Sequence, residues 1–275
     1  MVSITGSTID AWMQHPSSQM LRHPMFATLH AWSHGRLPDG ELPLDWTVAA
    51  MDEAGVNQGL LCAWRGPEGT LIENRDVAAA IERFPERFAG VAAVDLSNPV
   101  DAIRELRRCV RDFGFRALRV LPWLWGLPPD DRLYYPLYCE CVELSIPFCT
   151  QVGHAGPLRA SDPGRPIPYL DRVALDFPDL TIVAGHIGYP WTSEMISLAT
   201  KYENVYIDTS AYKASRYPPD LVEYLRTHGR YKVLFGSNHP AWPATECLRD
   251  LGQLNLDAKT TEAFLRGNAK RVFGL

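Results

Sequence analysis

Ile182-Val-Ala-Gly-His186 is a short apolar run that ends in a histidine, and Thr150-Gln-Val-Gly-His154 has the same form. A third run, Val233-Leu-Phe-Gly-Ser-Asn-His-Pro240, also passes from apolar to polar residues. Strands that are buried on both faces read as continuous apolar runs. The carboxyl ends of such strands are where parallel barrels carry their functional side chains. These segments therefore predict buried parallel strands with a site at their ends.

Apolar runs of this kind recur eight times, at about Ser7–Trp12, Gln58–Ala63, Phe88–Asp95, Ala117–Leu121, Pro147–Val152, Leu180–Ala184, Val205–Thr209 and Lys232–Gly236. Helical patterns separate most of them, for example from Asp45 to Gly55 and from Asn98 to Gly114. Alternating strands and helices predict an α/β fold with a parallel sheet. Eight units predict closure as a (β/α)8 TIM barrel, which typically needs about 250 residues. The alternative is an open doubly wound sheet, but no G-x-G-x-x-G motif follows the first run.

We expect residues 1–275 to form one barrel domain with two insertions, at about 15–43 and 121–131. Each insertion follows a predicted strand, so both are expected on the face that carries the site. Long ordered loops at that face commonly act as lids. A contact between the subunits of a homodimer is the alternative role for them.

The composition excludes several classes of partner. A formal net charge of −5 gives no reason to expect nucleic acid, and no apolar run reaches the roughly 18 residues of a membrane span. No signal peptide is visible at the start of the sequence, so a cytoplasmic location is expected. The six cysteines form no pair of CxxC motifs and are expected to be reduced and structural. The expected partner is a small-molecule substrate.

Four further motifs resemble, in order, those of the amidohydrolase-related superfamily, in the branch of the aminocarboxymuconate-semialdehyde and γ-resorcylate decarboxylases. They are Phe84-Pro-Glu-Arg-Phe88, Asp176-Phe-Pro-Asp-Leu180, Asn204-Val-Tyr-Ile-Asp-Thr-Ser210 and Gly267-Asn-Ala-Lys-Arg-Val-Phe273. The resemblance covers nearly the whole chain. It implies a metal-dependent-hydrolase-like barrel that normally binds a divalent ion.

The sequence departs from that family at the metal ligands. The family's Asp-x-His-x-His at the end of the first strand is matched by Asp10, Trp12 and Gln14, and its Asp after the eighth strand by Asn238. An indole has no usable lone pair, and zinc prefers Cys, His and carboxylate ligands. His154 and His186 alone match the family's histidines. We therefore expect no cofactor, with a divalent metal such as zinc as the alternative.

The remaining polar residues suggest roles in catalysis and binding. An unperturbed imidazole titrates near pH 6.5, so His154 and His186 are the candidate acid and base, and Asp208 is the carboxylate that orients a histidine or acts as base. Asp10 is expected to be an internal hydrogen-bond anchor. The expected substrate-binding residues are Trp12, Gln14, Arg119, Asn238 and His239. Among these, Arg119 suits a substrate carboxylate, and the neutral amides suit a developing oxyanion.

Three functions follow from this set. The first is hydrolysis, without a metal, of a small cyclic or aromatic carbonyl compound such as a lactone, ester or amide. The second is non-oxidative decarboxylation of an aromatic or unsaturated acid. Loss of carbon dioxide leaves a carbanion, so this reaction needs a proton donor. The third is a non-catalytic ligand-binding barrel in which the altered ligands mark abandoned chemistry.

Overall fold

The parallel strands form one eight-stranded sheet in the computed structural model, which describes residues 8–33 and 40–275. Its order is β1-β2-β5-β6-β7-β8-β9-β10, and every neighbouring pair is parallel. The strands are Thr8–Met13 (β1), Val56–Cys62 (β2), Phe88–Ala92 (β5), Ala117–Val120 (β6), Phe148–Gln151 (β7), Ile182–Gly185 (β8), Val205–Asp208 (β9) and Val233–Leu234 (β10). Each overlaps one of the eight apolar runs, so the TIM-barrel prediction is confirmed.

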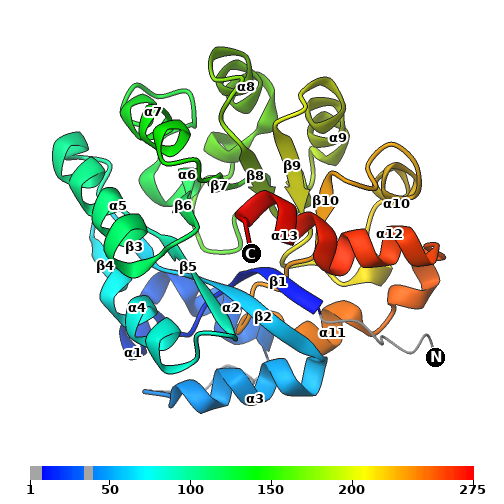
Figure 1. The fold of residues 1–275 in the computed structure, drawn as a ribbon, viewed down its shortest axis with the longest axis horizontal. Coiled ribbons are helices and arrows are strands. Elements are labelled where there is room, and N and C mark those ends of the chain that lie inside the picture. Colours follow the sequence, from blue (N-terminus) through cyan, green and yellow to red (C-terminus); the bar gives the residue numbers. More distant parts are fainter. Residues whose placement is uncertain (1–7, 34–39) are drawn as a thin grey trace.

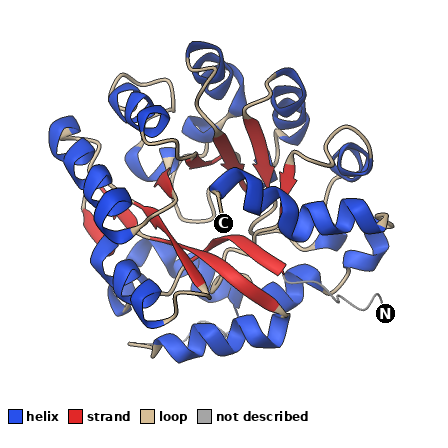
Figure 2. Cartoon of the chain, in the orientation of Figure 1, coloured by secondary structure: helices blue, strands red, loops and turns tan. Residues whose placement is uncertain are grey.

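Main-chain hydrogen bonds close the ring between its first and last strands. The Ala11 N–H donates to the Phe235 carbonyl over 2.9 Å, and the Asn238 N–H donates to the Trp12 carbonyl over 2.8 Å. The strands lie inside a ring of helices in Figures 1 and 2. Helix α13 contacts β1 and β10.

The helices are Ser18–Arg22 (α1), Ala27–Ser33 (α2), Leu44–Ala54 (α3), Asn74–Arg83 (α4), Pro99–Phe113 (α5), Pro122–Trp125 (α6), Tyr135–Glu143 (α7), Asp171–Asp176 (α8), Thr192–Lys201 (α9), Pro219–Arg226 (α10), Ala244–Leu248 (α11), Ala258–Glu262 (α12) and Asn268–Phe273 (α13). Helix α5 begins and ends as its sequence predicts. The Asn98 side chain accepts from the Asp101 N–H, and Gly114 ends the helix at φ 68°. That left-handed conformation favours glycine.

Register places the two histidine-bearing strands side by side. Thr150 of β7 pairs with Ala184 of β8, and Gln151 pairs with Gly185. The loops that carry His154 and His186 therefore leave the sheet together. Because all the strands are parallel, these ends meet the ends of β1, β9 and β10 at one mouth of the barrel.

Several elements were not predicted from the sequence. The strands Trp64–Gly66 (β3) and Gly69–Ile72 (β4) form a separate antiparallel hairpin after β2. The 15–43 insertion contains α1, a 3-10 helix at Pro24–Phe26 (η1) and α2. Residues 34–39 of this insertion, and Ser7 of the first apolar run, lie outside the described residues. The 121–131 insertion contains α6.

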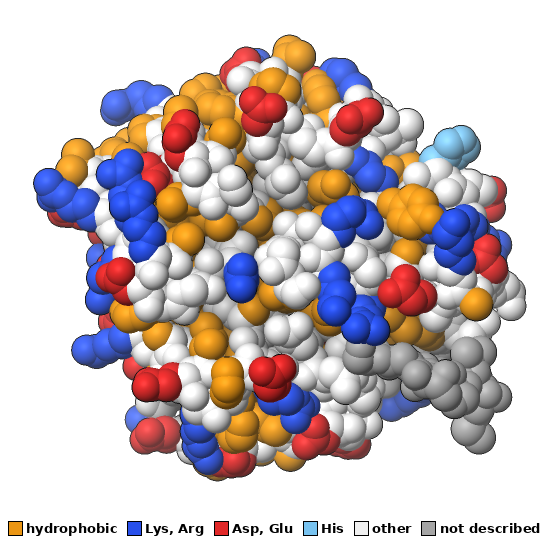
Figure 3. Space-filling model, in the orientation of Figure 1, with side chains coloured by type: hydrophobic (Ala, Val, Ile, Leu, Met, Phe, Trp, Pro, Cys, Tyr) orange, Lys and Arg blue, Asp and Glu red, His pale blue; other side chains and the backbone are white. Residues whose placement is uncertain are grey.

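Positive and negative side chains are interspersed over the face drawn in Figure 3. Within the described residues, no helix combines the length and apolar character needed to cross a bilayer. All six cysteines are unpaired thiols, and only Cys139 is exposed. These thiols agree with the expectation of reduced cysteines.

Candidate active site

A cavity of about 170 Å³ lies at the carboxyl ends of the barrel strands. A cavity of about 150 Å³ holds one benzene, so this one has room for a small, single-ring compound. Most of its wall is aromatic or apolar, and His154, His186, Gln151 and Asn238 supply its main polar side chains. The other lining residues are Trp12, Phe26, Leu29, Trp64, Leu121, Trp123, Gly156, Pro157, Ala211, Tyr212 and Trp242.

The backbone turns sharply where three strands reach this cavity. His186, Ala211 and Asn238 follow β8, β9 and β10 and have φ values of 72°, 68° and 71°. Non-glycine residues adopt this left-handed region at some cost, and such residues cluster at functional sites. Half of the six non-glycine residues with positive φ in the described chain line this one cavity. The strain therefore supports the cavity as the functional site.

His186 is the buried imidazole of the cavity, with 7% of the residue exposed. Its Nδ1 lies 2.6 Å from the Ser210 Oγ, and its ring centroid lies 5.3 Å from that of Trp12. Burial, with smaller effects from Arg119 and His154, lowers the pKa of His186 to about 3. The imidazole is therefore neutral at pH 7, with Nε2 left for the cavity.

Asp208 lies behind His186 rather than in the cavity wall, and it is fully buried. Its Oδ1 accepts from the Ser210 N–H over 2.9 Å and from the Ser210 hydroxyl. Burial raises the pKa of Asp208 to about 7, against the lowering effect of the Ser210 hydrogen bonds. Asp208 reaches the His186 imidazole through Ser210, a residue that sequence reasoning did not single out, and it also accepts a hydrogen bond from the His186 main chain.

His154 is the exposed histidine of the pair. Its N–H donates to the Tyr189 carbonyl over 2.6 Å, and its carbonyl accepts from the Gln151 Nε2 over 3.0 Å. These main-chain bonds fix the loop after β7 and leave the imidazole at the cavity wall. The structure therefore brings both predicted histidines to the same cavity, one buried and one exposed.

Arg119 lies beneath the cavity wall, between two indole rings. Its guanidinium carbon is 5.1 Å from the ring centroid of Trp12 and 4.9 Å from that of Trp64. Its Nη1 donates to the Gln14 Oε1 over 3.3 Å and its Nη2 to the Ala63 carbonyl over 3.0 Å. Asp95, the carboxylate at the end of the third predicted strand, pairs with Arg65 at 2.8 Å and not with Arg119. No carboxylate forms an ion pair with Arg119 among the described residues, so a buried positive charge stands behind the aromatic wall.

Gln14 does not border the cavity, because both ends of its amide are used internally. The Oε1 accepts from Arg119 and from the Trp64 Nε1, and the Nε2 donates to the Asn238 Oδ1 over 3.2 Å. The substrate-binding role expected for Gln14 is therefore not supported by its position. Asn238 does border the cavity, and with its Oδ1 facing Gln14 it keeps its Nδ2 as the remaining donor.

His239 lies outside the cavity, packed against α3. Its ring centroid is 5.0 Å from that of Trp46, and its Nε2 is 3.5 Å from the Thr47 Oγ1. His15 contacts the same Thr47 Oγ1 through Nδ1, at 2.8 Å. Each of the two histidines comes one residue after a position that matches a family metal ligand, Gln14 or Asn238. Because side chains alternate along a strand, both histidines point away from the mouth. Their contacts support a structural role in place of the substrate contact expected for His239.

Asp10 is the internal anchor that its place within the first strand indicates. Its carboxylate accepts from the Ser237 N–H over 2.9 Å, from the Ser237 hydroxyl and from the Trp12 N–H over 3.1 Å. Burial raises its pKa to about 6. These bonds tie β1 to the segment after β10 and help to close the barrel.

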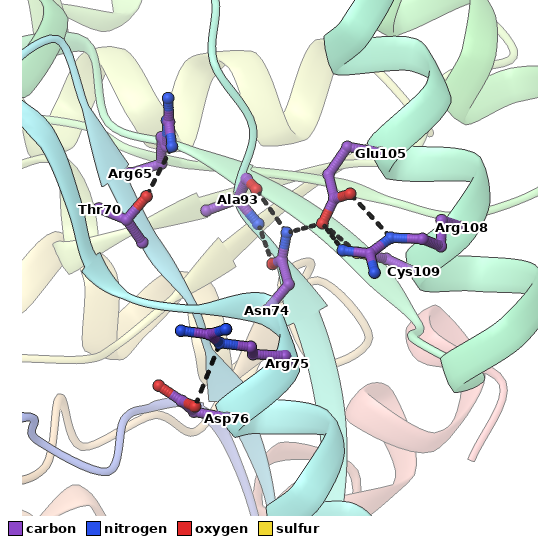
Figure 4. Close-up of polar contacts among 9 residues, drawn as sticks. All are labelled: Arg65, Thr70, Asn74, Arg75, Asp76, Ala93, Glu105, Arg108 and Cys109. Atoms are coloured by element: carbon purple, nitrogen blue, oxygen red, sulfur yellow. Dashed lines mark hydrogen bonds and ion pairs between the residues drawn. The ribbon is translucent and has the colours of Figure 1, made fainter.

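A larger cavity of about 360 Å³ lies near β3, α4 and α5, but four of its charged groups form ion pairs, Arg65 with Asp95 and Arg108 with Glu105. Figure 4 shows Asn74 between the Ala93 main chain and Glu105, and Glu105 bound to Arg108. The Arg65 guanidinium donates to Thr70 over 2.7 Å and to Asp95 over 2.8 Å. Among the residues that the structure describes, no histidine lines this cavity. The smaller cavity is therefore the better candidate site.

A closed parallel barrel with histidines at the carboxyl mouth and an aromatic cavity defines the class: a TIM-barrel protein of the metal-dependent-hydrolase type. A model of the amidohydrolase family matches residues 33–275. The chain belongs to the amidohydrolase family, as its motifs indicate.

Relatives in this family have several activities. A 2-keto-4-carboxy-3-hexenedioate hydratase from a Sphingobium species is 28% identical over 242 residues, which cover 73% of this chain and 70% of that protein. A γ-resorcylate decarboxylase from a Polaromonas species is 27% identical over 256 residues, covering 73% and 76%. A TIM-barrel protein from Bordetella bronchiseptica superposes with a TM-score of 0.84 at 25% identity, covering 98% of this chain and 99% of that one. The expected branch of the superfamily is confirmed.

The residues at the mouth do not fit the divalent ion that this family implies. A Polaromonas dihydroxybenzoic acid decarboxylase, with 19% identity and a TM-score of 0.71, has been solved with manganese; the alignment covers 98% of each chain. At the positions that correspond to the two histidines of the family's first-strand motif, Trp12 offers an indole, and the Gln14 amide is fully hydrogen-bonded. The His186 Nδ1 bonds Ser210. No group of three His, Cys, Asp or Glu side chains within the described residues could hold a metal ion.

Proposed function

We propose that this protein is an enzyme that activates water with His186 to attack a small, anionic, cyclic or aromatic carbonyl compound. The observation that carries the proposal is a neutral imidazole held at the wall of an aromatic cavity. Hydrolysis of a lactone, ester or amide is the leading reaction. A metal is not part of the proposal, because the donor set does not fit one.

His186 moves the proton in this mechanism. Its Nε2 takes a proton from water while the water oxygen bonds to the carbonyl carbon and the carbonyl electrons move to oxygen. The Asn238 Nδ2 donates to that oxyanion. When the tetrahedral centre collapses, the bond to the leaving oxygen or nitrogen breaks, and His186 returns the proton to it.

The low pKa of His186 favours an anionic substrate. An imidazole with a pKa of about 3 is a weak base in the empty cavity. A neighbouring negative charge raises the pKa of an imidazole, because it stabilises the protonated form. A substrate carboxylate in the cavity would therefore strengthen the base, and it would also be attracted by the buried charge of Arg119.

Non-oxidative decarboxylation is the second candidate, and the γ-resorcylate decarboxylase relative favours it. In that reaction the bond to the carboxylate carbon breaks, carbon dioxide leaves, and the electron pair on the remaining carbon takes a proton. The exposed His154 borders the cavity and could deliver that proton. The neutral His186 is the weaker candidate donor.

The test is turnover in water enriched in oxygen-18, with carbon dioxide measured in the same samples. A panel of aryl lactones, aryl esters and hydroxybenzoates would be offered to metal-depleted protein. Incorporation of the label without carbon dioxide is the expected result. Release of carbon dioxide would replace hydrolysis with the second candidate, and binding without any turnover would favour a ligand-binding barrel.

The His186→Asn variant tests the assigned residue. We expect its kcat to fall by about a hundredfold or more, the usual scale of acid–base catalysis. The matched control is His228→Asn, because His228 is an exposed histidine outside the cavity. Full activity of His186→Asn on a substrate that the wild type turns over would overturn the mechanism.

A further inference from the structure

We infer that Ser210 is a positioning residue that fixes the tautomer of His186 by linking its Nδ1 to the carboxylate of Asp208. The inference rests on the proposed function only where it treats His186 as the base. Ser210 and Asp208 lie where β9 ends, next to His186 at the end of β8, and both are fully buried. Neither borders the cavity.

The direction of the two hydrogen bonds follows from counting protons. The Ser210 hydroxyl has one proton, and its oxygen contacts both the Asp208 Oδ1 and the His186 Nδ1. The Asp208 Oδ1 already accepts the Ser210 main-chain N–H over 2.9 Å, which marks it as an acceptor. The hydroxyl proton therefore points to Asp208.

The second bond must then run from His186 to Ser210. Because the hydroxyl proton is spent on Asp208, the Ser210 oxygen can only accept from the imidazole. Nδ1 carries the proton, and Nε2 carries the lone pair. No hydrogen bond to Nε2 occurs among the described residues, so the lone pair is available to the cavity.

The consequence is that the imidazole is held ready as an acceptor. A histidine that lacks such a partner exchanges between two neutral tautomers, and only one of them presents a lone pair at Nε2. In serine proteases, a buried carboxylate likewise sets the tautomer of the catalytic histidine. Here a hydroxyl stands between the carboxylate and the ring.

The experiment is nitrogen-15 NMR of the full-length protein labelled at histidine, at neutral pH and without substrate. The resonances of His186 are assigned by their loss in His186→Asn. We expect a protonated Nδ1 and an unprotonated Nε2 in the wild type. A protonated Nε2 in the wild type would overturn the inference, whatever the variants do.

The Ser210→Ala variant supplies the second measurement. We expect the Nδ1-protonated population to fall, and kcat to drop about tenfold with little change in KM, because the cavity wall is unaltered. Ser210→Thr keeps the hydroxyl and should restore the wild-type tautomer. Unchanged His186 resonances in folded Ser210→Ala would contradict the inference.

Ser237→Ala is the matched control for the loss of a buried serine–aspartate hydrogen bond. Ser237 is fully buried and bonds Asp10, but its oxygen accepts from the His239 main chain and not from an imidazole. We expect its stability loss to resemble that of Ser210→Ala while the His186 tautomer stays unchanged. The tautomer of His186 is measured by NMR without substrate and does not depend on activity. Full activity of His186→Asn would therefore overturn the proposed function, but it would not contradict the inference that Ser210 fixes the tautomer.

Discussion

At the scale of single residues, the site depends on how each polar group is partnered. Trp12, His154, His186 and Asn238 reach the cavity, while Gln14, whose amide is spent internally, does not. The partners of His186 likewise leave its neutral imidazole with a hydrogen-bond acceptor at Nε2. Two residue-scale predictions follow from groups that lie behind the cavity wall.

Arg119→Met should weaken the binding of anions. Met keeps much of the packing between the two indoles but removes the buried charge, so attraction for a carboxylate falls. We expect the dissociation constant for 2,6-dihydroxybenzoate to rise about tenfold, measured by quenching of the tryptophans that line the cavity. Binding of uncharged resorcinol is the control and should hardly change. Equal weakening of both ligands would point to a packing defect.

His239 should make the protein sensitive to acid. Burial, with a smaller effect from His15, lowers the pKa of His239 to about 3. The unfolded state, with a pKa near 6.5, therefore binds more protons below pH 6.5, and stability is lost as the pH falls toward 3. Relative to His239→Asn, the wild type should lose up to about 1.4 kcal/mol per pH unit in that window.

Urea unfolding at several pH values measures this difference. The free energy of unfolding of the variant is subtracted from that of the wild type at each pH, because Asp10 and Asp208 change stability with pH in the opposite direction to His239. Their folded pKa values are raised, so their contribution is lost as the pH rises from about 4. A wild type and a His239→Asn variant with parallel pH profiles would show that His239 is not buried in its neutral form.

At the scale of elements, strand positions were predictable and side-chain partners were not. Each of the eight buried strands is visible in the sequence as an apolar run. Because side chains alternate along a strand, Asp10, Trp12 and Gln14 are assigned to one face of the first strand. The hairpin of β3 and β4 escaped prediction because its strands have only three and four residues. Ser210 could have been found, since it stands two residues beyond Asp208, where the strand next to the one that leads to His186 ends.

The close approach of β1 and β8 gives an element-scale prediction. A Cβ at Gly185 would lie 2.7 Å from the Trp12 ring, which is itself buried. We expect Gly185→Ala to displace that ring, to cost about 1–3 kcal/mol of stability, and to weaken binding of an aromatic ligand. Gly252→Ala is the control, because in the described chain no atom outside its own local backbone and chain neighbours lies within 4 Å of its Cβ position. Unchanged ligand binding in Gly185→Ala would mean that Trp12 does not shape the cavity.

At the scale of the whole molecule, the barrel keeps the family's architecture, while its mouth carries residues that differ from the metal ligands expected from the family's motifs. Parallel strands deliver side chains to one face whatever those side chains are. The fold therefore persists although Trp12, Gln14 and Asn238 stand at ligand positions. Sequence alone could mark those substitutions, but only the folded chain reveals how Gln14 and His186 are partnered.

The most direct measurement is the metal content and activity of the whole protein, isolated without chelator and then dialysed against one. We expect well under one equivalent of transition metal per chain and unchanged turnover after dialysis, because His186 activates water by itself. A stoichiometric metal bound through His154 and His186, whose removal abolishes turnover and whose return restores it, would contradict water activation by a neutral histidine.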